Sequence, residues 1–313
     1  PQLSTGQKNS IYKSFCIGLT VAAIFSVGSG IYAYLKTGDW YTYYPSGTIK
    51  THHLFYEGLA SPLMHPGYFS LYTGLSILII WQKNPFGLKQ WLQIIWIASL
   101  FIFLLMLQGR MNIIAFVLIL SGYLIYKVIA LKNAKLLFAF GGALLVLAIV
   151  LMSLPNAIKG RLFFSPSFQY DITAPDMHSF TGVTIRLAEW SCAIQAINEN
   201  LPFGAGIGDS KQVLIESYHQ NNFRLGIQEQ FNCHNQYLET FLAVGFPGLI
   251  ILFAIAISYF TQAIRNKNPL LLMAALFFFL SIATESMLLR HWAITLFCTL
   301  YLFMAFESKK LLT

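Results

Sequence analysis

The chain has 313 residues, of which 56% are hydrophobic and only 10% are charged, and its net charge is +8. A soluble domain carries about 25% charged residues, so this composition excludes an ordinary soluble protein and predicts a membrane protein. The positive charges are spread over short connections between apolar runs, and this distribution argues against nucleic-acid binding.

Eight apolar runs are long enough to be interpreted as membrane-spanning helices, which need about 18 residues. In chain order they cover residues 14–35, 66–82, 91–108, 111–130, 136–154, 237–262, 269–286 and 291–306. The sequence therefore predicts an all-α polytopic membrane protein in three parts. Residues 1–154 form five spans with an outer segment at 36–66, residues 155–235 form a large, partly helical loop, and residues 236–313 form three spans.

Lysines and arginines in the connections and tails predict the orientation of the chain. Eleven of them fall on the side that holds both termini and four fall on the other side. The richer side is cytoplasmic by the positive-inside rule, so the loop at 155–235 is predicted to lie outside the cytoplasm. All seven histidines are assigned to the same outer side, and we expect the functional groups there.

The outer segment at 36–66 is rich in tyrosine, glycine and histidine. Its aromatic rings suit the membrane interface, so an aromatic belt is favoured over a sugar-binding surface, and His52 and His53 have no assigned role. Cys192 and Cys233 both lie in the outer loop, where a disulfide is permitted, but nothing in the sequence fixes their separation. No cysteine or histidine spacing predicts a metal site.

In the loop, residues 184–198 carry apolar side chains at helical spacing, which predicts an amphipathic helix on or near the membrane. Arg186 and Trp190 share one face of this helix and form either a phosphate clamp or an ordinary aromatic anchor. Pro202 is expected to end the helix. The glycine-rich turn at 204–208 lacks the spacing of a nucleotide-binding loop and is interpreted as structural, and a second helix is predicted at 210–219.

Three further places in the sequence could carry chemistry. Arg110 lies between two apolar runs, where it either meets lipid phosphates or holds a phosphate with its planar donor fork. His234 precedes a span, with Asn235 as the predicted N-cap. An imidazole at a helix start is expected to have a low pKa and to accept a proton from a hydroxyl, although a satisfied polar residue is the commoner case. For Glu285 and Arg290, in one outer turn, an ion pair is favoured over a phosphate contact.

Taken together, these motifs resemble those of the O-antigen ligase / O-antigen polymerase superfamily. The residues that carry the resemblance are GRMN at 109–112, RLAEWSCA at 186–193, NLPFGAGIGD at 200–209 and HNQYLETFLAVGFPGL at 234–249. HPGYFS at 65–70 and TESMLLR at 284–290 look like variants of the family from Bacteroidota-type envelopes. Members typically have about twelve spans, so the resemblance implies that four precede this chain.

The resemblance implies a metal-independent membrane glycosyltransferase without a cofactor, in the bacterial inner membrane, with its active site facing the periplasm. Such enzymes move a glycan from undecaprenyl diphosphate to an acceptor hydroxyl, for example on lipid A-core. By motif match, His234 would be the catalytic base, and Arg110 and Arg186 would hold the diphosphate. Attack opposite the leaving group would invert the anomeric centre. The possible supporting residues are Asn235, Trp190, Glu285, Arg290 and His65.

A ligase is the leading interpretation. A polymerase or a protein O-oligosaccharyltransferase of the same superfamily would use the same chemistry on another acceptor. A polysaccharide transporter is disfavoured, because transporters place ionisable residues near the bilayer midplane and the spans between 14 and 154 hold almost none away from their ends. A glycoside hydrolase is also disfavoured, because it would need paired carboxylates and the motifs show no such pair. The sugar, the acceptor and the oligomeric state stay open.

Overall fold

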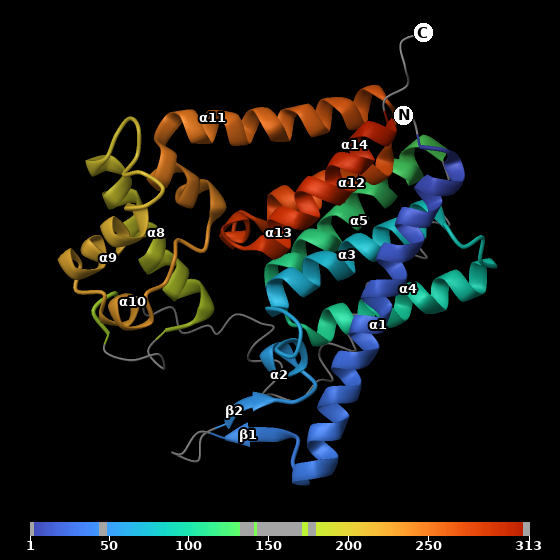
Figure 1. Cartoon of the computed structure of the whole chain (residues 1–313), viewed down its shortest axis with the longest axis horizontal. Coiled ribbons are helices and arrows are strands. Elements are labelled where there is room, and N and C mark those ends of the chain that lie inside the picture. Colours follow the sequence, from blue (N-terminus) through green and yellow to red (C-terminus); the bar gives the residue numbers. More distant parts are fainter. Residues whose placement is uncertain (1–2, 44–48, 132–140, 143–170, 175–179, 309–313) are drawn as a thin grey trace. The chain divides into compact units, whose positions relative to one another are not determined.

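The computed structural model describes residues 3–43, 49–131, 141–142, 171–174 and 180–308 (Figure 1). The described chain is mostly helical, as predicted, with one small sheet. It divides into two compact units. Unit 1 contains Pro1–Leu162, Ala263–Phe278 and Tyr301–Thr313, and unit 2 contains Phe163–Gln262 and Phe279–Leu300. Most of the span predicted at 136–154 lies outside the described residues.

Unit 1 is built around one buried helix. α3 (Pro66–Lys83) contacts α1 (Thr5–Thr37), α4 (Gln90–Met106) and α5 (Arg110–Leu131). Its side chains are apolar on nearly every face, and Leu71, Leu75 and Ile79 are fully buried, as expected for a helix surrounded by others. β1 (Tyr41–Tyr43), β2 (Ile49–His52) and α2 (Tyr56–Ala60) form a small antiparallel hairpin and a short helix between α1 and α3 in the chain.

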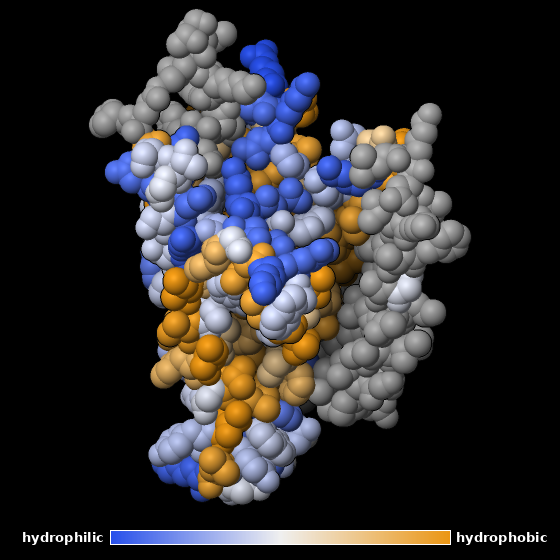
Figure 2. All heavy atoms as spheres, turned by 90° about the vertical axis from the view of Figure 1, so that its right-hand side faces the viewer, coloured by the Kyte–Doolittle hydropathy of each residue, from blue (hydrophilic) through white to orange (hydrophobic). Residues whose placement is uncertain are grey.

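Three helices of the described chain are long and apolar enough to cross a membrane: α1, α5 and α11 (Gln236–Arg265). The shorter apolar helices are α4, α12 (Pro269–Ser281) and the segment at 291–305. This segment consists of α13 (His291–Leu296), the π-helix η3 (Phe297–Tyr301) and most of α14 (Leu302–Ser308). Figure 2 shows hydrophobic residues gathered in a band below the middle of the drawn face, and Ile24 of α1 is 67% exposed. The protein is thus a helical membrane protein, while the number of eight spans and their orientation stay predictions.

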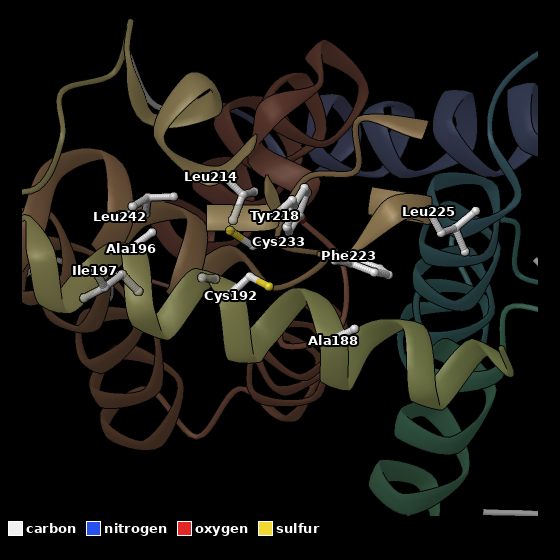
Figure 3. Close-up of a cluster of buried hydrophobic side chains, with 11 residues drawn as sticks. Ala188, Cys192, Ala196, Ile197, Leu214, Tyr218, Phe223, Leu225, Cys233 and Leu242 are labelled. Carbon is white, nitrogen blue, oxygen red and sulfur yellow. The ribbon is translucent and has the colours of Figure 1, made fainter. Parts of the chain in front are cut away.

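Unit 2 has a hydrophobic core of its own, made by the loop before α11 and by the first turns of α11 (Figure 3). α8 (Gly182–Glu199), α9 (Ser210–Gln220) and α10 (Arg224–Glu229) surround it, so both helices predicted for the loop are confirmed. The apolar face of α8 packs into this core through Ala188, Ala193 and Ala196, and the position of this helix on or near the membrane stays a prediction. Cys192 and Cys233 are buried in the same core as free thiols.

α11 is not one continuous helix. Gly245 has φ 66° and ψ −155°, so the span predicted at 237–262 consists of a short helix at 236–244 and a long apolar helix at 246–265. The glycine-rich turn before α9 is bonded to this break. Ala205 N–H donates to the Leu242 carbonyl at 2.8 Å, which caps a helix end whose carbonyls have no partner within the helix. The turn is therefore structural, as predicted.

Two further features lock the turn to the break. Gly206 N–H donates to the Ala243 carbonyl at 3.0 Å, and Phe246 N–H donates to the Pro202 carbonyl at 3.0 Å. The backbones also approach closely, since a Cβ atom on Gly245 would lie 2.2 Å from the Pro202 oxygen. Gly245 is therefore needed both for its positive φ and for the space.

We predict that Gly245→Ala destabilises the protein, because it adds a clash to a backbone conformation that costs about 1–3 kcal/mol for other residues. The measurement is thermal unfolding in detergent. Gly208→Ala is the matched control, since Gly208 belongs to the same turn but a Cβ there meets nothing within 4 Å. Equal melting temperatures for the two variants would contradict the locking role of Gly245.

Candidate active site

His234 lies in the segment between α10 and α11. Asn235 is the N-cap of α11, as predicted: its Oδ1 accepts hydrogen bonds from the N–H groups of Tyr237 at 2.9 Å and Leu238 at 3.2 Å. His234 itself has φ 40°, and its N–H donates to Asn232 Oδ1 at 2.8 Å. The histidine therefore precedes the cap, on a sharply turned backbone that is tied down locally.

The imidazole of His234 is paired with a buried carboxylate on α8. His234 Nδ1 lies 2.9 Å from both Oε1 and Oε2 of Glu189, and the Glu189 side chain has no exposed surface. A buried carboxylate without a partner is strongly unfavourable, so the histidine stabilises this position. Because the carboxylate binds Nδ1, the other ring nitrogen, Nε2, is left to accept a proton when the imidazole is neutral.

The pairing changes the pKa of both groups. Burial raises the pKa of Glu189 above its ordinary value, and the hydrogen bond from His234 offsets only part of that increase. Burial alone would lower the pKa of His234, but the hydrogen bond and the charge of Glu189 outweigh it, so the pKa of His234 is raised. Our expectation of a low pKa from the nearby helix start was therefore wrong, because the carboxylate in contact exerts the larger effect.

A second carboxylate faces the other side of the histidine. Glu285 Oε1 lies 3.9 Å from His234 Nε2, which is too long for a hydrogen bond. Glu285 Oε2 lies 3.8 Å from Arg186 Nη2. Glu285 therefore forms a loose ion pair, as expected, but its partner in the described chain is Arg186 and not Arg290. The turn that carries Glu285 packs beside the start of α8, which is distant in the sequence.

Arg186 is oriented by two backbone carbonyls. Its Nε donates to the Thr284 carbonyl at 3.2 Å and its Nη1 donates to the Gly182 carbonyl at 2.9 Å. Its side chain is 34% exposed and that of Glu285 is 18% exposed. The guanidinium is thus fixed in direction, and its Nη2 faces the partly exposed carboxylate of Glu285.

A buried serine joins the two segments that carry His234 and Glu285. Ser286 Oγ accepts a hydrogen bond from Asn235 N–H and donates one to Glu239 Oε2, both at 3.2 Å. Glu239 is buried and also accepts a hydrogen bond from Cys233 N–H at 3.0 Å. Residues on both sides of His234 are therefore bonded to one network, and this network sets the position of Glu285 opposite the imidazole.

Of the other predicted site residues, Trp190 follows Glu189 on α8, and its indole Nε1 is buried without a hydrogen-bond partner in the described chain. Arg290 is the N-cap of α13 and lies on the surface. Arg110 begins α5, and His65 is the N-cap of α3, with Nδ1 accepting from Gly67 N–H at 3.2 Å.

The starts of α3 and α5 lie side by side in unit 1, because Asn112 Nδ2 donates to the Gly67 carbonyl at 2.7 Å. Arg110 and His65 are thus near one end of unit 1, whereas His234, Glu189, Arg186 and Glu285 belong to unit 2. The joint action of both groups in one site stays a prediction.

Glu189 is the residue that sequence reasoning missed. It lies within the motif at 186–193, but attention went to its arginine and tryptophan. A signal was present, since Glu189 shares the buried face of α8 with Cys192, Ala193 and Ala196. A carboxylate on the apolar face of an amphipathic helix requires a partner, and this requirement alone would have selected Glu189.

Apolar helices together with a buried histidine–carboxylate pair and an adjacent arginine define a membrane protein with a potential acid–base site. The family described as O-antigen ligase matches residues 94–253, from α4 into α11, and the chain belongs to this family. Membership indicates a membrane glycosyltransferase of the O-antigen ligase or polymerase type. The match includes Arg110, Arg186, Glu189 and His234, whereas Glu285 lies beyond it. A search of curated proteins finds no match.

We predict that Glu189→Gln lowers the pKa of His234, because the substitution removes the charge that stabilises the imidazolium. The measurement is an NMR titration of ring-labelled histidines, with the His234 signal assigned from the spectrum of His234→Gln. Glu199→Gln is the control, since Glu199 is exposed near the end of the same helix. An unchanged or higher pKa in Glu189→Gln would show that the pair does not set the protonation of His234.

Proposed function

We propose that this protein is an O-antigen ligase that transfers a polysaccharide from undecaprenyl diphosphate to an acceptor hydroxyl on the periplasmic face of the bacterial inner membrane. Family membership supports a glycosyltransferase of this general type. The observation that carries the chemical assignment is the contact of His234 Nδ1 with Glu189 at 2.9 Å. This contact leaves Nε2 as the atom that takes the proton of the acceptor hydroxyl.

In the proposed reaction, the acceptor oxygen forms a bond to the anomeric carbon while the bond from that carbon to the diphosphate breaks. The hydroxyl proton passes to His234 Nε2, and the resulting imidazolium is stabilised by Glu189. The diphosphate departs as an anion, so it needs neutralisation of its charge and no strong acid. Arg186 and Arg110 supply that positive charge, the reaction needs no metal, and attack opposite the leaving group inverts the anomeric centre.

The raised pKa of His234 has two opposite effects on this reaction. A higher pKa makes the neutral imidazole a stronger base, but it also increases the fraction of imidazolium, which cannot accept a proton. The rate should therefore increase as pH rises through the pKa of His234. In Glu189→Gln the same increase should occur at lower pH, with a smaller maximal rate, because the imidazolium loses its stabilising charge.

A phosphate bound by Arg186 competes with the loose contact between Arg186 and Glu285. The guanidinium keeps its two carbonyl contacts and donates to a phosphate oxygen from Nη2, which faces Glu285 at 3.8 Å. Glu285 then acts as a resting counter-ion for Arg186 and His234. Its repulsion of the incoming diphosphate is the cost of keeping both cationic groups paired before the donor binds.

The test of the function is deletion of the gene, followed by gel analysis of surface polysaccharide after complementation with the full-length wild type or with His234→Ala. We expect the deletion strain to make long glycan that stays on its lipid carrier, and only the wild type to restore the attached ladder. Removal of the base should slow transfer by about 10²–10⁴-fold. His219→Ala is the matched control, since His219 is an exposed histidine at the end of α9.

The other outcomes distinguish the alternatives. Single repeat units attached to the acceptor in the deletion strain would identify a polymerase. Loss of glycan from proteins, with an unchanged lipid-attached ladder, would identify a protein O-oligosaccharyltransferase. Full complementation by His234→Ala would refute the catalytic assignment for each of these enzymes.

The resting role of Glu285 gives a separate prediction. Glu285→Gln should lower the KM for the diphosphate-linked donor, because Arg186 no longer has a competing carboxylate. The measurement is transfer in vitro at varied donor concentration, and Glu216→Gln on the exposed side of α9 is the control. An increased KM would mean that Glu285 itself contributes to donor binding.

A further inference from the structure

The glycine-rich turn exposes two large apolar side chains. Ile207 is 81% exposed and Phe203 is 74% exposed, the highest values for large apolar side chains in the described chain. Turns are normally polar because they face water. Residues 201–208 carry no charged side chain, so this turn has the composition of a surface that contacts something apolar.

The depth of this turn relative to the membrane follows from its attachment to α11. Three backbone hydrogen bonds tie it to the break at Gly245, from Ala205, Gly206 and Phe246. The apolar helix at 246–265 has about 20 residues, and at about 1.5 Å per residue it is as long as the hydrocarbon core is thick. Where this helix crosses the membrane, the break falls at one boundary of the hydrocarbon core, and the turn lies at the same level.

The exposed face of that helix is continuous with the turn. Phe246, Ile250 and Ile257 are exposed apolar residues on the long part of α11, as expected for a face that contacts lipid. A Cβ atom on Gly245 would lie 2.5 Å from the backbone of Phe203, so the backbone at Phe203 adjoins the start of the long apolar helix. Exposed apolar residues of the span and of the turn therefore lie on adjoining segments.

We propose that residues 201–207 insert Phe203 and Ile207 into the phospholipid bilayer at the boundary of headgroups and acyl chains. This insertion is independent of the transfer reaction. It requires only that the helix at 246–265 crosses the membrane. It also holds His234 near the membrane surface, because the helix at 236–244, which begins two residues after His234, is only about 14 Å long at a rise of about 1.5 Å per residue.

Site-directed spin labelling of the full-length protein in phospholipid nanodiscs, without donor lipid, tests the insertion. Single cysteines replace Phe203 or Ile207 in a Cys298→Ala background, since Cys298 is an exposed thiol whereas Cys16, Cys192 and Cys233 are buried. Glu216→Cys on the exposed side of α9 is the water reference, and Ile257→Cys on α11 is the lipid reference.

We expect labels at 203 and 207 to collide with molecular oxygen more often, and with a polar nickel chelate about fivefold less often, than the label at 216, because apolar side chains of membrane anchors lie below the headgroups. Collision rates equal to those at 216 would overturn the proposal. Protection that appears only after addition of a polyprenyl diphosphate would also overturn it, and would assign the surface to the donor chain instead. The label at 257 verifies that the span is in the bilayer in every variant.

Discussion

The buried carboxylate of Glu189 is the constraint on which the candidate site depends. It lies on the face of α8 that packs into the core of unit 2, where an unpaired charge would be strongly unfavourable. The imidazole of His234 satisfies it and in turn becomes oriented, with one ring nitrogen held and the other available. The same contact thus stabilises the fold of the loop and orients the imidazole that we propose as the base.

Around this pair, the positions of the other groups follow from connections between segments distant in the chain. Ser286 and Glu239 bond the turn after α12 to the start of α11, and this connection brings Glu285 opposite His234. Lys211 of α9 donates to the Phe231 carbonyl at 2.8 Å, so the backbone before the histidine is held as well. The site is therefore assembled by hydrogen bonds from α8, α9, α11 and the turn before α13.

Local signals predicted much of this arrangement, and long-range contacts account for what they missed. Helical spacing predicted the two loop helices to within a few residues, and the side-chain chemistry of Asn235 predicted its cap. The glycine and proline at 245–247 were visible, but an unbroken apolar run concealed the break in α11. The partners of His234 and Glu285 were missed, because sequence reasoning paired Glu285 with the nearest cation and considered only the helix dipole at His234. In both cases the actual partner lies at least 45 positions away in the sequence.

The locked joint at Gly245 has a consequence for the response of the protein to its lipid environment. A span tilts when its hydrophobic length differs from the thickness of the bilayer. A flexible linker would absorb such a tilt, whereas three backbone hydrogen bonds and a close backbone contact transmit it to the helix that begins after Asn235. Acyl-chain length is therefore a variable that acts on the orientation of His234, and membranes of different thickness hold this residue and its partners at different angles to the membrane plane.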